Sequence, residues 1–121
     1  MKERALIVDD DPELLSILKR YLENHGFETV LAADGVKALA AAATAKPDII
    51  ITDVDMPRMD GFELTARIRA DSRLSDLPVV LVTALESREE KERGIEVGAN
   101  AYVIKSGFDQ TTLLEIIGRL A

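Results

Sequence analysis

The fold that we expect for this chain depends on one segment, Ile49-Ile50-Ile51-Thr52-Asp53-Val54-Asp55-Met56-Pro57. Its short apolar run is typical of a parallel strand buried on both faces, and Pro57 marks the loop that follows. A buried strand ends in a carboxylate only where something outside the strand compensates the charge, so we expect Asp53 to have a functional role. In open α/β sheets ligands bind in the crevice beyond the carboxyl ends of the strands, and Asp53 falls at such an end.

Further strands are predicted by four more short apolar runs, at residues 5–8, 27–32, 78–83 and 101–104. Apolar residues at helical spacing follow each strand, and the last helix has a clean stripe of Leu113, Ile116, Ile117 and Leu120 with Asp109 as its cap. Five strands alternating with five helices predict an α/β fold, (βα)5, with a doubly wound five-stranded parallel sheet. With no internal repeat or linker, we expect a single domain over residues 1–121.

The second and fourth helices differ in composition. The second is rich in Ala, starts at Asp34-Gly35, and is expected to turn Val36, Leu39 and Ala43 inward. The fourth, from Ser87 to Val97, opens with a Ser-x-x-Glu capping box and is mostly charged. Since helices draw most of their stability from an apolar face, we expect the fourth to pack least firmly and to be a movable or partner-facing element.

Composition excludes several classes of function. The 22 acidic and 15 basic residues give a formal charge of −7, which repels nucleic acid and anionic membranes, so we expect no direct contact with either. Cys is absent, which removes disulfides, thiol chemistry and thiolate metal sites. The N-terminal apolar run is too short for a signal peptide or a membrane span, and we expect a cytoplasmic protein.

Charged and polar residues cluster at one predicted edge of the sheet. Right-handed crossovers bring the loops after the first, third, fourth and fifth strands together there, with Asp9, Asp10, Asp53, Asp55, Thr83 and Lys105. Two carboxylates about 4 Å apart repel by about 4 kcal/mol at an effective dielectric near 20, so such a group needs a cation. Lys105 neutralises only part of the charge, and the remainder suits Mg²⁺, a hard ion with oxygen ligands.

Phosphoryl transfer fits this set of groups. A carboxylate can attack phosphorus to give an aspartyl phosphate, and the reaction asks the protein mainly for positioning and charge neutralisation. Asp53, Mg²⁺, Lys105 and the Thr83 hydroxyl would supply those parts.

The spaced set resembles the receiver domains of two-component response regulators, which act in phosphorelay signal transduction. The match covers nearly the whole chain, through Asp9-Asp10, Asp53 in Asp-Val-Asp-Met-Pro, Gly61, Thr83-Ala84 and Lys105. The resemblance implies a flavodoxin-like strand order of 2-1-3-4-5. It also implies that Asp53 is phosphorylated by a sensor kinase phosphohistidine, that Asp10, Asp53 and the backbone carbonyl of Asp55 ligate Mg²⁺, and that Asp9 supports the metal through water.

The same resemblance assigns a switch and partners. Thr83 and Lys105 would bind the phosphoryl oxygens, and Tyr102 would turn inward when Thr83 moves. The partners would be a sensor histidine kinase or phosphotransfer domain, and a downstream protein or fused output domain. Such a protein modifies only its own Asp, so we do not expect an enzyme that turns over a separate substrate.

The segment after the fifth strand departs from the family pattern. Receivers usually have Pro after this Lys, joined by a cis peptide, whereas Ser106 follows Lys105 here. A cis bond before Ser costs about 2.5 to 4 kcal/mol, so the loop is either trans or held strained. Residues 105–109 are similar to receivers fused to chemotaxis-type histidine kinases, which raises the possibility of a longer protein.

Two other functions stay open at this point. An interaction module with this fold could have lost phosphorylation, which the Lys105-Ser106 departure favours mildly. Asp53-Val54-Asp55 also matches the Asp-x-Asp of haloacid-dehalogenase-type phosphatases, although that pair normally follows the first strand of a larger domain. Flavin binding is excluded, because the first loop offers three aspartates where a phosphate needs hydroxyls and amides. Acidic residues at strand ends are often only helix caps, and we interpret Asp11 or Asp34 in this way. His25 is interpreted as a polar residue at a helix end.

Overall fold

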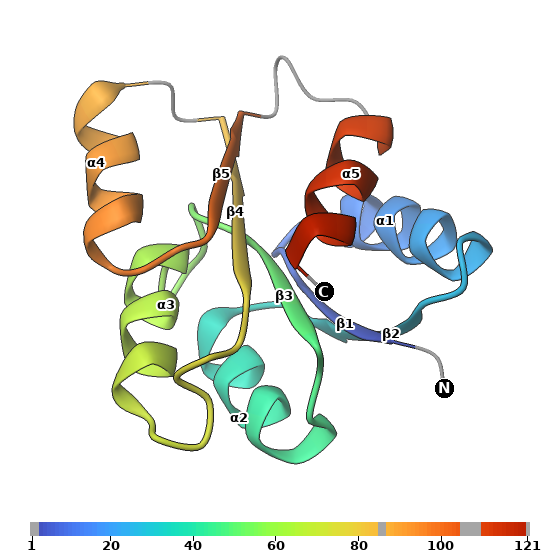
Figure 1. Cartoon of the computed structure of the whole chain (residues 1–121), viewed down its shortest axis with the longest axis horizontal. Helices are drawn as coiled ribbons and strands as arrows, with labels where there is room; N and C mark the ends of the chain where they lie inside the picture. The colour runs from blue at the N-terminus through green and yellow to red at the C-terminus, as the bar shows by residue number, and fades with distance from the viewer. Residues whose placement is uncertain (1–2, 85–86, 105–109, 121) are drawn as a thin grey trace.

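A computed structural model of the chain describes residues 3–84, 87–104 and 110–120 (Figure 1). In this part of the chain, five parallel strands form one sheet in the order β2-β1-β3-β4-β5. The strands are β1 (Arg4–Val8), β2 (Glu28–Ala32), β3 (Ile49–Asp53), β4 (Val79–Thr83) and β5 (Ala101–Ile104). The predicted fold class and strand order are confirmed.

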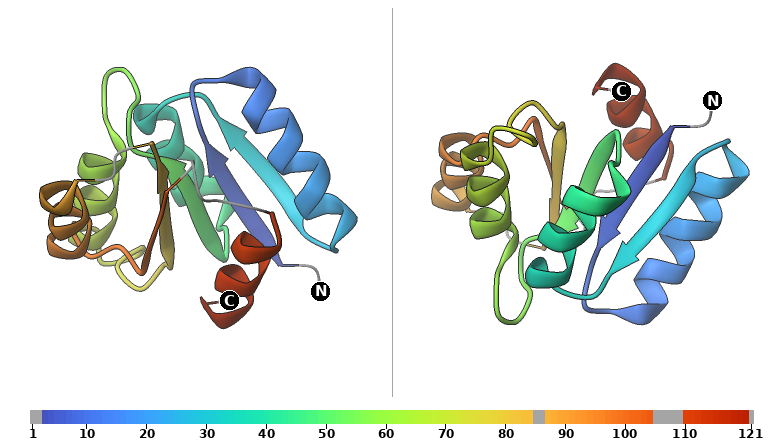
Figure 2. Two further views of the ribbon diagram at one scale, coloured as in Figure 1. Left: turned by 90° about the horizontal axis from the view of Figure 1, so that it is seen from above. Right: turned by 90° about the horizontal axis from the view of Figure 1, so that it is seen from below.

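Helices cover both faces of the sheet. They are α1 (Pro12–Asn24), α2 (Gly35–Ala45), α3 (Gly61–Ala70), α4 (Arg88–Glu96) and α5 (Gln110–Leu120). Figures 1 and 2 show α1 and α5 on one face, and α2, α3 and α4 on the other. The carboxyl ends of the strands therefore form one edge between two helical layers, as expected for a doubly wound sheet.

The central strand β3 is buried along its whole length and joins two hydrophobic clusters. Ile50 packs with Leu6 and Leu81 on the face covered by α2 and α3. Ile49 and Ile51 point to the opposite face, toward α1 and α5. Because burial of one such side chain contributes about 1.5–3 kcal/mol, the strand that ends in Asp53 is anchored on both sides.

Side-chain caps fix where the helices begin. Oxygens of Asp11, Asp34, Asp60 and Ser87 accept backbone N–H groups from the first turns of α1, α2, α3 and α4. A cap of this kind contributes about 1 kcal/mol. The predicted caps at Asp11, Asp34 and Ser87 are therefore confirmed, whereas the cap predicted at Asp109 lies outside the described residues.

The predicted inner face of α2 was right only at Leu39, which is half-buried and packs against the core. Val36 is 50% exposed and Ala43 is half-buried, whereas Gly35, Ala38 and Ala42 are the buried residues. An Ala-rich helix is apolar nearly all round, so its periodicity does not define which side faces the sheet. The rotation of α2 is set instead by the close approach of Gly35 to Met59, where an added Cβ would lie 2.5 Å from the Met59 carbonyl oxygen.

The helices after β4 and β5 match their predicted character. In α4 only Gly94 is buried, and Ile95 is 74% exposed. The Arg93 guanidinium lies 4.8 Å from the centre of the Phe62 ring and joins α4 to α3. In α5, Leu113 and Ile117 are buried, as the apolar stripe predicted. Within the described ranges, none of the helices has the length and apolar character needed to cross a bilayer.

Candidate functional site

Three carboxylates meet at the carboxyl edge of the sheet. Asp9 and Asp10 follow β1, and Asp53 ends the neighbouring strand β3. One carboxylate oxygen from each residue lies within 4.8 Å of those from the other two. Asp9 is 4% exposed and Asp53 7%, while Asp10 is exposed to solvent. The structure thus brings together the acidic group that the strand connections predicted.

Backbone N–H groups orient the two buried carboxylates. Val54 donates to Asp53 Oδ1 at 2.9 Å, and Asp11 donates to Asp9 Oδ1 at 3.0 Å. The Asp9 amide in turn donates to the Ala32 carbonyl at 3.1 Å, which holds the first residue after β1 beside the end of β2. The carboxylates are therefore held by the main chain of the loops that carry them.

Gly61 lets α3 begin directly against the end of β3. Its amide donates to the Val54 carbonyl at 2.8 Å. A Cβ at this position would lie 2.5 Å from the Asp53 carbonyl oxygen, a distance that no side chain allows. The sequence suggested Gly61 only through the family resemblance, and the close approach gives the physical reason for glycine.

The electrostatics of the cluster favour a cation. At 4.8 Å, two carboxylates repel by about 3 to 4 kcal/mol with an effective dielectric near 20. Three oxygen donors of this kind suit a small hard divalent ion, since Mg²⁺ is commonly held by one or two carboxylates together with water and phosphoryl oxygens. The donor set of Asp9, Asp10 and Asp53 therefore fits Mg²⁺.

Thr83 and Tyr102 form a second part of the edge. Thr83 is fully buried at the end of β4, and side-chain alternation places it with Tyr102 on the sheet face of α2, α3 and α4. Burial raises the pKa of Tyr102, the negative charge of Glu90 raises it further, and a hydrogen bond with Thr83 acts in the opposite direction. The Tyr102 ring also lies where a Cβ on Gly94 would come within 3.0 Å. Tyr102 thus links Thr83 to α4.

The structure does not place Asp55 in this cluster, and it does not describe Lys105. The Asp55 side chain is exposed and is not among the three clustered carboxylates. Its backbone carbonyl, the group that the resemblance assigns to the metal, belongs to the loop between β3 and α3. Lys105 and its peptide bond to Ser106 lie outside the described residues.

Sequence reasoning missed an ion pair between the loop that follows β3 and the start of α2. Arg58 Nη2 lies 2.7 Å from Asp34 Oδ2, although the two residues are 24 positions apart. Asp34 was interpreted only as the cap of α2. Bonds from the Lys37 amide and from Arg58 hold the pKa of Asp34 below its usual range. No spacing or motif indicated the pair, because it depends on how two loops pack.

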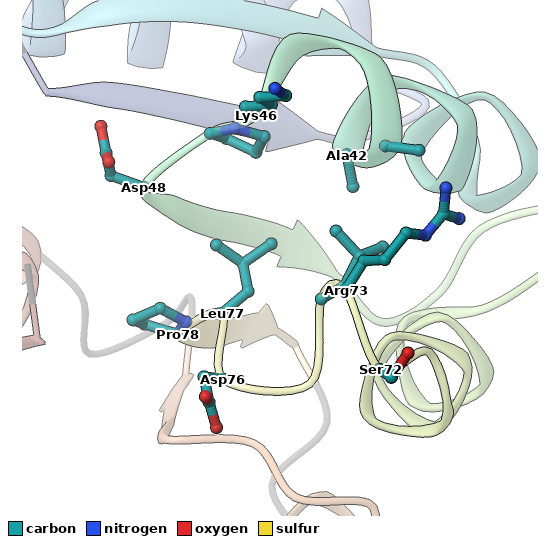
Figure 3. A pocket seen from close by; sticks show the side chains of 11 residues that line it. Ala42, Lys46, Asp48, Ser72, Arg73, Asp76, Leu77 and Pro78 are labelled. Carbon is teal, nitrogen blue, oxygen red and sulfur yellow. The ribbon is translucent and has the colours of Figure 1, made fainter.

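A cavity of about 690 Å³ lies at the opposite edge of the sheet (Figure 3). It is lined by residues just before β3 and β4, including Pro47, Asp48, Leu77 and Pro78. Two of its charged groups have other partners: Asp48 accepts the Arg4 amide at 2.7 Å, and Arg73 pairs with Asp71 at 2.9 Å. The cavity is therefore separate from the acidic cluster in position and in chemistry.

Comparison with known proteins identifies the family. The model of the response regulator receiver domain matches residues 5–118. RpaA of Synechocystis, a DNA-binding dual master transcriptional regulator, is 39% identical over 111 residues, which are 92% of this chain and 46% of RpaA. This chain spans about half the length of the curated relatives that it matches.

Solved structures agree in fold over the full length of the chain. The chemotaxis protein CheY4 of Vibrio cholerae is 36% identical, with a TM-score of 0.93 and complete coverage of both chains. The receiver domain of the sensor histidine kinase PA1611 from Pseudomonas aeruginosa is 28% identical, with a TM-score of 0.90 over 99% of this chain and 98% of that one. That structure holds a magnesium ion in its active-site cleft.

Proposed function

This chain belongs to the response regulator receiver domain family, and we propose that it accepts a phosphoryl group on Asp53 and thereby switches a partner-binding surface. The observation that carries the proposal is the cluster of Asp9, Asp10 and Asp53, with ligand oxygens within 4.8 Å of one another. A structural role does not explain why three carboxylates share one place, because their repulsion opposes folding.

Asp53 is the nucleophile in this proposal. The hydrogen bond from Val54 to Asp53 Oδ1 fixes the carboxylate at the end of β3. A carboxylate oxygen of Asp53 attacks phosphorus, and the bond between phosphorus and the donor's leaving atom breaks as the new O–P bond forms. The donor would be a phosphohistidine of a sensor kinase or of a phosphotransfer domain.

The acidic neighbours would hold Mg²⁺. Asp10, Asp53 and the backbone carbonyl of Asp55 are the proposed ligands, and Asp9 would act through water. The ion would neutralise charge that develops on the transferred phosphoryl group. The carboxylates of Asp9 and Asp10 would keep this ion beside Asp53, because their negative charge attracts a cation.

Thr83, Lys105 and Tyr102 are the proposed readout. Thr83 and Lys105 would bind phosphoryl oxygens, and movement of Thr83 would change the contact that it makes with Tyr102. The hydrogen bond between Thr83 and Tyr102, and the packing of Tyr102 near Gly94, support this route from the site to α4. The weakly packed α4 would be part of the surface that partners recognise.

The proposed downstream partner is suggested by the longer relatives of this chain. Residues 1–121 would form one receiver domain, and the relatives that are about twice as long suggest a fused or separate output domain. A charge of −7 makes direct binding of this domain to nucleic acid unfavourable. RpaA is described as DNA-binding, and for this chain we propose that any such contact belongs to an output domain.

Phosphorylation by a small donor tests the proposal. The protein is incubated with acetyl phosphate, with and without Mg²⁺, and its intact mass is measured. We expect a gain of one phosphoryl group that requires Mg²⁺ and that disappears in Asp53→Asn. An equal gain in Asp53→Asn, or no gain in the wild type, would contradict it, and sustained turnover of a phosphomonoester would point to a phosphatase instead.

A further inference from the structure

The loop between β3 and α3, residues 54–60, contains a strained turn. Arg58 has φ of 69°, in the left-handed region that non-glycine residues rarely adopt. The Met59 amide donates to the Pro57 carbonyl at 2.8 Å, which closes a three-residue turn around Arg58. A three-residue turn with positive φ at its centre is rare and strained, so contacts outside the turn must hold it.

The contact that holds it is the pair of Arg58 and Asp34. The Asp34 side chain is 1% exposed, and each of its oxygens has a partner on a different element. Oδ1 accepts the Lys37 amide at 2.8 Å and caps α2, while Oδ2 accepts from Arg58 Nη2 at 2.7 Å. One buried carboxylate therefore joins the start of α2 to the tip of the loop after Asp53.

The two loops also touch through their main chains. An added Cβ on Gly35 would lie 2.5 Å from the Met59 carbonyl oxygen, and Met59 is 7% exposed. At its base the loop is closed by the bond from the Gly61 amide to the Val54 carbonyl. The segment that carries the Asp55 carbonyl is thus fixed at its base and at its tip.

We infer that Arg58 and Asp34 are positioning residues for the divalent ion, and that their ion pair holds the loop so that the Asp55 carbonyl and the Asp53 carboxylate face the same point. This inference rests on the proposed function. Neither side chain touches the ion: Arg58 acts through the turn at residues 57–59, and Asp34 acts through Arg58. Groups that orient metal ligands in this way are commonly needed for full metal affinity.

Charge alone predicts a different result, which makes the inference testable. Arg58 is a cation near a cation site, so its removal would strengthen Mg²⁺ binding if only its charge mattered. Removal of the Asp34 charge would weaken binding for the same reason. Positioning predicts instead that loss of either partner weakens Mg²⁺ binding.

Calorimetric titration of the unphosphorylated protein with Mg²⁺ distinguishes the charge effect from the positioning effect. The variants are Asp34→Asn, which keeps an oxygen to cap α2, and Arg58→Asn, which tolerates positive φ. We expect each to weaken Mg²⁺ binding about tenfold, and the double variant to bind no more weakly than the single ones, because they remove one interaction. Arg58→Lys keeps the charge and a donor, and should recover part of the affinity.

A matched control removes a similar pair at the other edge of the sheet. Arg73→Asn deletes the pair of Arg73 and Asp71, whose atoms lie 2.9 Å apart, and should leave Mg²⁺ affinity unchanged. Hydrogen exchange of the amides in residues 54–60 without metal should rise in Arg58→Asn and stay unchanged in Arg73→Asn.

The possible results have distinct meanings. Unchanged or tighter Mg²⁺ binding by Arg58→Asn would overturn the inference and leave the proposed function intact. Failure of the wild-type protein to bind Mg²⁺ would overturn both. If Arg58→Asn is unfolded by circular dichroism, amide exchange in Asp34→Asn decides the question. Faster exchange of residues 54–60 without metal supports positioning, and unchanged exchange contradicts it.

Discussion

The two edges of the parallel sheet differ in how their charged groups are compensated. At the carboxyl edge, Asp9, Asp10 and Asp53 place like charges within 4.8 Å of one another. At the amino edge, Arg69 donates hydrogen bonds to the Gly98, Ser75 and Leu77 carbonyls and to Asn100 Oδ1, at 2.6–3.1 Å. One edge therefore stabilises the fold, whereas the other gives up stability to keep negative oxygens together for a ligand.

Loss of the Arg69 guanidinium should have the largest effect on stability. Arg69→Met keeps the aliphatic stem but leaves several carbonyls at the amino edge without their donor, which we expect to cost roughly 3 kcal/mol. Urea denaturation measures this change, and Mg²⁺ affinity should stay as in the wild type. A cost below about 1 kcal/mol would mean that water replaces the guanidinium and that the two edges differ less than we infer.

Removal of one negative charge at the carboxyl edge should act in the opposite direction. Asp53→Asn preserves the shape of the side chain and relieves repulsion from Asp9 and Asp10, so we expect the metal-free protein to gain about 2 kcal/mol. The free energy of unfolding in the presence of a chelator measures the gain. Saturating Mg²⁺ should remove the advantage, because the ion binds the wild type more tightly. Destabilisation by Asp53→Asn in chelator would show that the acidic cluster does not lower the stability of the metal-free protein.

Removal of the Tyr102 hydroxyl should have the smallest effect and should depend on pH. Tyr102→Phe takes away the hydrogen-bond partner of the buried Thr83 hydroxyl, which we expect to cost about 1 kcal/mol at neutral pH.

The sign of the pH effect follows from the raised pKa of Tyr102, which burial and the charge of Glu90 produce. A group whose pKa is higher in the folded state stabilises the fold below the unfolded value of 10.0, and this contribution is lost as pH rises through the folded value. The stability deficit of Tyr102→Phe should therefore shrink above about pH 10. A constant deficit between pH 8 and about pH 11 would show that Tyr102 does not face a desolvated, negative environment.

The acidic cluster could be predicted from sequence because it depends on connectivity. Parallel strands joined by right-handed crossovers bring their carboxyl ends to one edge, and Asp9, Asp10 and Asp53 each stand at such an end. The caps at Asp11, Asp34 and Ser87 were predictable for a similar reason, since capping involves residues two or three positions apart.

Two features could not be predicted in this way. The predicted rotation of α2 was wrong at Val36, because an Ala-rich segment presents an apolar surface in every direction. The pair of Arg58 and Asp34 was missed because an exposed arginine and a helix cap each have an ordinary local explanation. Both features depend on the packing of the loop at residues 54–60 against the start of α2.

The sequence by itself determined the order of strands and helices along the chain and the buried central strand, because these follow from the local hydrophobic pattern. It also determined that acidic residues gather at the carboxyl edge of the sheet, because this follows from the chirality of the connections. Only the tertiary structure decided which face of α2 is buried, that Tyr102 makes a hydrogen bond with Thr83, and that Arg58 in the loop after Asp53 pairs with Asp34. These depend on contacts between residues far apart in the chain, whose distances are set when two helical layers close on one sheet.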